Sequence, residues 1–119
     1  MKKENILLDK SLHFAARVVK LHRYLVKEKH ESVISKQIIR SATSIGANAN
    51  EAVYGISKAD FIAKLQIALK EANETSYWLE LLLETNYIDE ARYQELNNNC
   101  SQIRGMLIKS INTAKGDEK

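Results

Sequence analysis

The chain contains no proline and only four glycines in 119 residues. These two residue types most often interrupt helices and form turns, so their scarcity predicts few turns and long regular elements. Leu, Ala, Lys, Glu and Ile are the most frequent residues, and most of them favour helix. The length suits one domain with one modest core. The sequence therefore predicts a single all-α domain spanning residues 1–119.

Apolar residues recur every three or four positions in four segments, at about 7–29, 33–54, 58–85 and 89–113. Connections of a few residues make consecutive helices antiparallel, so we expect an antiparallel up-down-up-down four-helix bundle. Ser57 and Asp89 are the expected N-caps of the third and fourth segments. Gly55 is expected to end the second segment in the left-handed conformation, and the tail from Ala114 is expected to fray.

The first segment carries two adjacent apolar rows, which predict an unusually wide apolar face. Because one bundle cannot easily cover so many apolar faces, contact with other copies of the chain is expected. One row contains Leu8, Leu12, Ala15, Val19, His22 and Val26, and the other contains Phe14, Val18, Leu21 and Leu25. The later seams are Ile34, Ile38, Ser41, Ile45, Asn48 and Ala52, then Phe61, Leu65, Ala68, Ala72, Thr75, Leu79 and Leu82, and finally Leu96, Cys100, Ile103, Leu107 and Ser110.

Residues 37–52, QIIRSATSIGANANEA, combine helical spacing with small polar side chains. Small residues let helix axes approach closely, which can offset the roughly 1 kcal/mol of helix propensity that a glycine loses against alanine. Arg40 lies on a stripe whose spacing matches one on the third segment, and it is expected to pair with Glu71 or Glu74. This pairing is interpreted either as a structural polar network or as a functional site. The expected network contains Arg40, Ser41, Ser44, Asn48, Glu51, Glu71 and Glu74.

The third-segment stripe also holds Ile67 and Trp78. Trp78 either fills the core or anchors a subunit interface, where tryptophan is over-represented. Since the stripe lies beside the main seam, we expect Ile67 and Trp78 at a subunit interface.

Charge is distributed unevenly along the chain. Residues 1–59 contain 11 Lys and Arg against 5 Asp and Glu, whereas residues 60–119 contain 7 against 10. No acidic residue occurs from Lys10 to Lys27, and basic residues in this stretch form a stripe expected to face away from the apolar rows. Such a stripe can hold a phosphate backbone without reading sequence, and Tyr24 can stack on a base. The alternatives are an ordinary solvated face or a surface that meets the acidic third segment. The candidate nucleic-acid surface comprises Lys10, His13, Arg17, Lys20, Arg23, Tyr24 and Lys27.

Residues suited to catalysis or to holding a cofactor do not form recognisable patterns. His13, His22 and His30 lack the spacing of helical metal ligands, and no glycine-rich phosphate loop occurs. Cys100 lies on a seam and is interpreted as a core residue, and a single cysteine suits a reducing cytoplasm. No apolar stretch is long enough to span a membrane. We therefore expect a cytoplasmic, non-catalytic protein without metal or cofactor.

Residues 37–52 are followed by a second characteristic segment, SKADFIAKLQIALKEANETSYWLELL. With these two segments the chain resembles the four-helix-bundle family of 23S rRNA intervening-sequence proteins, some of which are called S23 ribosomal proteins, and the resemblance covers almost the whole chain, from about residue 8 to 111. Gly55 departs from the family pattern, in which a glycine often comes sooner after the asparagine. The most specific part is the R-S-x-x-S-I-x-A-N-x-x-E core formed by Arg40, Ser41, Ser44, Ile45, Ala47, Asn48 and Glu51.

This resemblance implies a ring, typically a homopentamer, with no enzymatic activity. It also implies kinship with the accessory variability proteins of diversity-generating retroelements, basic barrels that bind nucleic acid and a reverse transcriptase. We expect the chain to bind structured RNA or an RNA–protein complex through the basic surface of its first helix. The alternative is a protein-interaction scaffold or accessory subunit, for example of a reverse transcriptase. A weaker third interpretation is attachment to anionic membrane surfaces.

Overall fold

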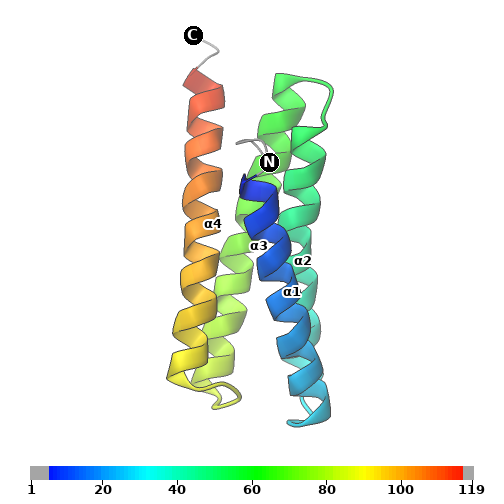
Figure 1. The fold of residues 1–119 in the computed structure, drawn as a ribbon, viewed down its shortest axis with the longest axis vertical. Helices are drawn as coiled ribbons and strands as arrows, with labels where there is room; N and C mark the ends of the chain where they lie inside the picture. Colours follow the sequence, from blue (N-terminus) through cyan, green and yellow to red (C-terminus); the bar gives the residue numbers. More distant parts are fainter. Residues whose placement is uncertain (1–5, 117–119) are drawn as a thin grey trace.

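The structure is a computed structural model that describes residues 6–116. It contains helices α1 (Ile6–Lys27), α2 (Val33–Val53), α3 (Lys58–Glu84) and α4 (Glu90–Gly116). Figure 1 shows consecutive helices running in opposite directions along one long axis. The predicted up-down-up-down four-helix bundle is confirmed.

The helix ends follow local capping chemistry, with two differences from the expectation. The Ser57 hydroxyl accepts the Asp60 N–H at 3.0 Å, and the Asp89 carboxylate accepts the Arg92 N–H at 2.8 Å, so both predicted N-caps are confirmed. The left-handed ending at Gly55 is wrong, because no glycine in the described part of the chain has a positive φ. The Gly55 N–H instead donates to the Ala52 carbonyl at 3.1 Å. The left-handed position follows α3, at Asn86 with φ 65°.

The end of α4 does not fray where the sequence suggested. The helix continues to Gly116, and Ala114 is buried with 8% of its surface exposed. Packing of Ile111 and Ala114 against the core holds this last part in place. Tertiary contact therefore overrides the weak sequence signal of the tail.

The core lies along one row of each helix. On α1 the buried row is that of Phe14, Val18, Leu21 and Leu25. The other row, predicted to share the core, lies at the edge of the bundle, where Leu12 is 68% exposed. A helix in a four-helix bundle buries one stripe, so the second row extends beyond it. On α2, α3 and α4 most predicted seam residues are buried, and the half-buried exceptions are Ile34, Asn48, Phe61 and Ser110.

Small residues bring α1 and α2 close together. A Cβ atom added to Gly46 would lie 3.4 Å from the Ser11 Cβ, and Ser11 is fully buried. Between α2 and α3, the buried Thr75 hydroxyl lies within hydrogen-bond distance of the Ser41 hydroxyl, at 2.8 Å. The small residues of α2 thus serve helix packing on two sides.

The neighbouring helices α1 and α4 pack less tightly than the other pairs. Side chains from both helices line open grooves between them. This seam is where most of the predicted basic surface lies.

Candidate nucleic-acid interface

A continuous groove runs along the seam between α1 and α4. Its first part has a volume of about 390 Å³, the second about 200 Å³ and the third about 370 Å³. Arg17 and Lys20 line both the first and second parts, and Tyr24 and Arg92 line both the second and third. We call this groove the basic trough. Its polar and charged lining residues are Lys10, His13, Arg17, Lys20, Tyr24, Lys29, Asn86, Tyr87, Asp89, Arg92, Glu95, Asn99 and Gln102.

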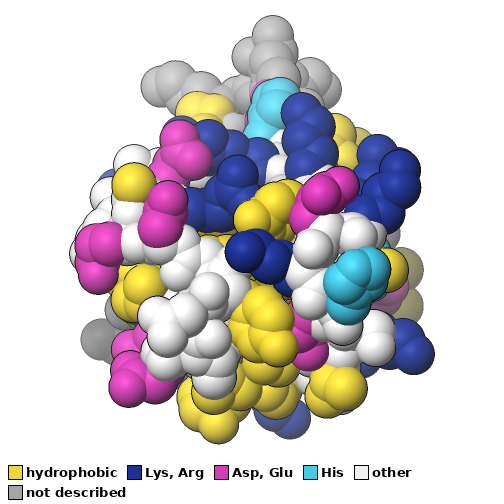
Figure 2. All heavy atoms as spheres, turned by 90° about the horizontal axis from the view of Figure 1, so that it is seen from below, with side chains coloured by type: hydrophobic (Ala, Val, Ile, Leu, Met, Phe, Trp, Pro, Cys, Tyr) yellow, Lys and Arg dark blue, Asp and Glu magenta, His cyan; other side chains and the backbone are white. Residues whose placement is uncertain are grey.

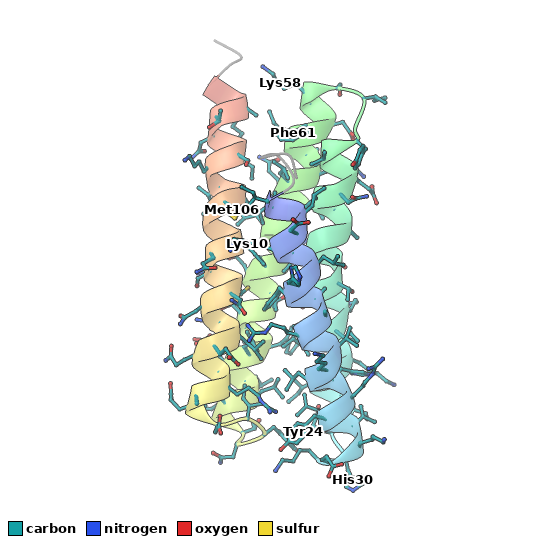
Figure 3. All side chains as sticks on the ribbon, in the orientation of Figure 1. Lys10, Tyr24, His30, Lys58, Phe61 and Met106 are labelled. Atoms are coloured by element: carbon teal, nitrogen blue, oxygen red, sulfur yellow. The ribbon has the colours of Figure 1, made fainter. Side chains whose placement is uncertain are left out.

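Positive charge dominates the trough, and its first part has no acidic lining residue. Asp89 and Glu95 lie farther along. Figure 3 places Lys10 on the side of α1 that faces α4. It places Tyr24 near the end of the bundle that holds the α1–α2 and α3–α4 loops. Figure 2, viewed from that end, shows dark-blue Lys and Arg side chains in the middle, between the α4 side on the left and the α1 side on the right. The cations that line the trough are Lys10, Arg17, Lys20, Lys29 and Arg92.

Arg17 reaches across the trough from α1 to α4. Its guanidinium forms an ion pair with Glu95 at 3.1 Å and a hydrogen bond to the Asn99 side chain. The expectation that the whole stripe faces away from the apolar rows is therefore wrong. Arg17 and Tyr24 lie next to the buried row on the surface of α1, on the side that faces α4, and both are half-buried.

Tyr24 is also engaged by neighbouring side chains. The Arg92 Cζ lies 4.9 Å from the ring centroid, and the Lys29 Nζ lies 6.0 Å from it. Both distances are within the range of cation–π attraction. The ring packs against the core as well, so the tyrosine is held in place rather than projecting into solvent.

The remaining members of the predicted surface lie around this trough or outside it. Lys10, His13 and Lys20 are exposed along its wall, and His13 Nδ1 is 2.9 Å from the Asp9 carbonyl. Arg23 and Lys27 are exposed but do not line the trough. The structure thus brings together five of the seven predicted residues.

Sequence reasoning missed the contribution of α4. Lys29 follows α1 in the loop, and Arg92, Asn99 and Gln102 come from the fourth helix. Their positions in the sequence give no sign that they lie opposite the α1 stripe. The short run Asn97-Asn98-Asn99 was a signal of polar surface, but it did not indicate which helix it faces.

Arg40 was predicted to pair with Glu71 or Glu74, and the structure shows it paired with both glutamates within one chain. The Arg40 Nη1 is 3.6 Å from the Glu71 Oε1, and its Nη2 contacts the Glu74 Oε2. The Trp78 indole N–H donates to the same Glu74 oxygen at 3.1 Å. The Glu71 Oε1 is buried and has no hydrogen-bond partner in the described part of the chain, since 3.6 Å is too long for one.

The other predicted members of this network form separate interactions. Glu51 pairs with Lys64 at 3.1 Å, and this hydrogen bond and charge raise the pKa of Lys64. Ser44 donates to the Arg40 carbonyl of its own helix, and Asn48 donates to the Ser44 carbonyl, both at 2.8 Å. The expectation of one connected network is therefore wrong. Short side chains on a helix reach their own backbone more readily than a neighbouring helix.

The two residues predicted at a subunit interface differ in their surroundings on α3. Ile67 is 42% exposed, whereas Trp78 is half-buried and packs against the core. Tyr77 meets Trp78 edge to face with ring centroids 5.0 Å apart, and Tyr77 itself is 55% exposed. Tyr77 and Trp78 thus form a partly exposed aromatic pair, whereas Ile67 lies about three helical turns away, with Glu71 and Glu74 between them on the same stripe.

No group of three or more potential ligands among residues 6–116 is placed to hold a metal ion. Cys100 is buried, its Sγ lies 3.3 Å from the Ala72 carbonyl, and burial raises the pKa of its thiol to about 11. Such a thiol is a poor nucleophile at neutral pH. Across the described helices, none has the length and apolar character needed to span a bilayer.

The chain is similar to a known protein family and to solved structures. Residues 3–109 match the family described as 23S rRNA-intervening sequence protein. The chain is also similar to a crystal structure of a protein with unknown function from the S23 ribosomal protein family of Bacteroides thetaiotaomicron, with 56% sequence identity and a TM-score of 0.91. That alignment covers 93% of this chain and 99% of the other. No curated protein matches the sequence.

Proposed function

The chain belongs to the family of 23S rRNA-intervening sequence proteins, and we propose that it binds structured RNA without catalysis, along the basic trough. The observation that carries this proposal is the continuous lining of the trough by five cations against two acidic side chains. The family description, which names an rRNA insertion, agrees with a polyanionic partner.

The trough suits contact with phosphates rather than with base edges along most of its length. Lys10 and Lys20 form no ion pair with any residue between 6 and 116, so their charges are available to a ligand. The Arg17–Glu95 pair is well exposed and contributes only about 0–1 kcal/mol. A phosphate can therefore displace Glu95 from Arg17 at small cost. Binding of this kind is driven by release of counterions and selects RNA by shape.

The proposal is tested by fluorescence anisotropy with a labelled structured RNA between about 50 and 200 mM salt. The test variant is Lys10→Gln/Lys20→Gln, which removes two exposed charges from the trough. Its control is Lys36→Gln/Lys70→Gln, which removes two exposed charges from the outer surfaces of α2 and α3. With four unpaired cations in the trough, the slope of log affinity against log salt should be about −3 to −4 per chain, and the test variant should reduce its size by about 1.5.

The control variant should bind like the wild-type protein. If wild-type protein fails to bind at low salt, where electrostatic attraction is strongest, the RNA proposal is refuted. The trough would then be a contact surface for an acidic protein partner, as an accessory subunit or scaffold requires. If both double variants weaken binding equally, the contact is a diffuse charge effect and the trough is not the site.

We also propose that the chain assembles with copies of itself, as a homopentameric ring, through the α3 surface around Ile67 and Trp78. The exposure of Ile67 and Tyr77 on α3 supports this, as does the partial exposure of Trp78. In a ring the trough is repeated, so weak contacts gain from avidity. Light scattering coupled to size-exclusion chromatography should give a multiple of 13.6 kDa for the wild type and the monomer mass for Ile67→Lys. A wild-type monomer at high concentration would refute assembly, and an Ile67→Lys variant that still assembles would move the interface elsewhere.

A further inference from the structure

The trough ends in a pocket of a different character. This third part, of about 370 Å³, lies beside the α3–α4 loop and the start of α4. Its lining combines two aromatic rings, an amide, two cations, one carboxylate and one aliphatic side chain, which come from Tyr24, Tyr87, Asn86, Lys29, Arg92, Asp89 and Ile88. The volume falls in the range of sites that take a small organic group. We call this part of the trough the end pocket.

The Arg92 guanidinium lies over the Tyr24 ring in the wall of the end pocket. The guanidinium carbon lies 4.9 Å from the centre of the tyrosine ring. The backbone of Arg92 is fixed by the cap of α4, where its N–H donates to the Asp89 carboxylate at 2.8 Å. Tyr24 is fixed by its packing against the core. A guanidinium plane supported in this way is a platform on which a nucleic-acid base can stack.

Asn86 adds a polar group that can read a base edge. Its positive φ of 65° is the usual geometry after a helix end, and its N–H donates to the Leu83 carbonyl at 3.0 Å. The position after the end of α3 accounts for the backbone conformation of Asn86, but it gives the Asn86 side chain no role. The exposed Asn86 amide forms no hydrogen bond with residues 6–116, so its donor and acceptor remain available.

We propose that the end pocket holds one unpaired base of the bound RNA. The base stacks on the guanidinium of Arg92, the Asn86 amide hydrogen-bonds its edge, and Lys29 meets the adjoining phosphate. Bases in a duplex are already stacked and paired, so only a loop, bulge or strand end can supply this base. The proposal rests on RNA binding along the trough, and it adds a preference for RNA with an unpaired nucleotide beside a helix.

The test compares two RNAs by anisotropy at one salt concentration. One is a blunt duplex, and the other has the same stem closed by a single-stranded loop that carries 2-aminopurine, whose fluorescence falls when it stacks. The variant Arg92→Lys keeps the charge but removes the planar group. Arg104→Lys is the control, because Arg104 is on the same helix and donates to Asn73 at 3.3 Å, away from the pocket. Asn86→Gly, which tolerates a positive φ, removes only the amide.

Wild-type protein should bind the loop RNA about 5- to 100-fold more tightly than the duplex and quench its 2-aminopurine. Arg92→Lys should lose most of this preference and the quenching while its affinity for duplex stays within about twofold, and Asn86→Gly should lose part of the preference. Equal binding of both RNAs by the wild type, or an unchanged preference in Arg92→Lys, overturns the end-pocket proposal and leaves trough binding standing. Absence of binding to either RNA at low salt refutes trough binding, and the end pocket then falls with it.

Discussion

The start of α2 offers a sharp test of how this chain is held together. Ser32 is the N-cap residue, but its side chain makes no capping hydrogen bond. The carboxylate of Glu31 caps the helix instead, and it accepts the backbone N–H groups of Val33 at 3.0 Å, Ile34 at 2.8 Å and Ser35 at 2.9 Å. Three of the four unpaired donors at this helix end thus depend on one side chain, which is only 7% exposed.

Replacing Glu31 with alanine should therefore cost more than the loss of an ordinary cap. Loss of a cap costs about 0.5–2 kcal/mol, and each hydrogen bond to a charged group contributes about 1.5–3 kcal/mol. Water can reach the N–H of the exposed Val33 but not that of the buried Ser35, so part of the loss is recovered. We expect Glu31→Ala to lower the free energy of unfolding by about 2–3 kcal/mol and the melting temperature by roughly 6–15 °C.

The measurement is urea and thermal unfolding followed by circular dichroism, at one fixed protein concentration so that assembly does not shift the result. Glu28→Ala is the matched control, because it makes the same change in charge at an exposed position in the same region. Glu31→Gln keeps an acceptor oxygen and should fall between the two. If Glu31→Ala costs no more than about 0.5 kcal/mol beyond Glu28→Ala, the capping argument is wrong, because even a weak cap contributes that much.

Four further predictions concern the packed interior. Gly46→Ala should stabilise the fold by up to about 1 kcal/mol in chemical denaturation, because a methyl group fits at 3.4 Å from Ser11, whereas Gly46→Leu should destabilise it. Thr75→Val should cost about 1 kcal/mol because the buried hydrogen bond between the Thr75 and Ser41 hydroxyls is lost while Ser41 keeps only its 3.3 Å bond to the Ile38 carbonyl, and Thr75→Ser should cost less because it keeps the hydroxyl. The thiol of Cys100, with its pKa raised to about 11, should react with a disulfide reagent at pH 8 at least about 100-fold more slowly in native than in denatured protein. Since the unfolded thiol loses its proton first, stability should fall as pH rises from about 8.5 toward 11, and a flat profile in that range would contradict the assigned burial.

The helices and most of the core were predictable from the sequence because their signals are local. The scarcity of Gly and Pro, the spacing of apolar residues and the side chains of Ser57 and Asp89 each act within a turn or two of helix. The two adjacent apolar rows on α1 gave no local indication of which row is buried in the core. The choice depends on where α2 and α4 lie, and this is why the exposure of Leu12 was missed.

Only part of the candidate site could be predicted from the sequence. The basic stripe of α1 could be identified from charge alone, and so could the Arg40 pairing from matched spacing. The partners Arg92, Glu95 and Asn99 are more than 65 positions away from the α1 residues that they meet, and nothing in their own surroundings marks them. The cap by Glu31 was missed for a different reason, because Ser32 is the residue type that usually takes this role.

The basic stripe also accounts for the looseness of the seam that it lines. Closing α1 onto α4 as tightly as onto α2 would remove from water Lys10 and Lys20, neither of which forms an ion pair with a residue between 6 and 116. Burial of an unpaired ammonium group costs several kcal/mol, more than the burial of additional apolar surface along a short stretch of helix can offset. The open trough is therefore the stable arrangement for this sequence. An anion that enters the trough meets cations already in place, so little of its binding energy is spent on reorganising the bundle.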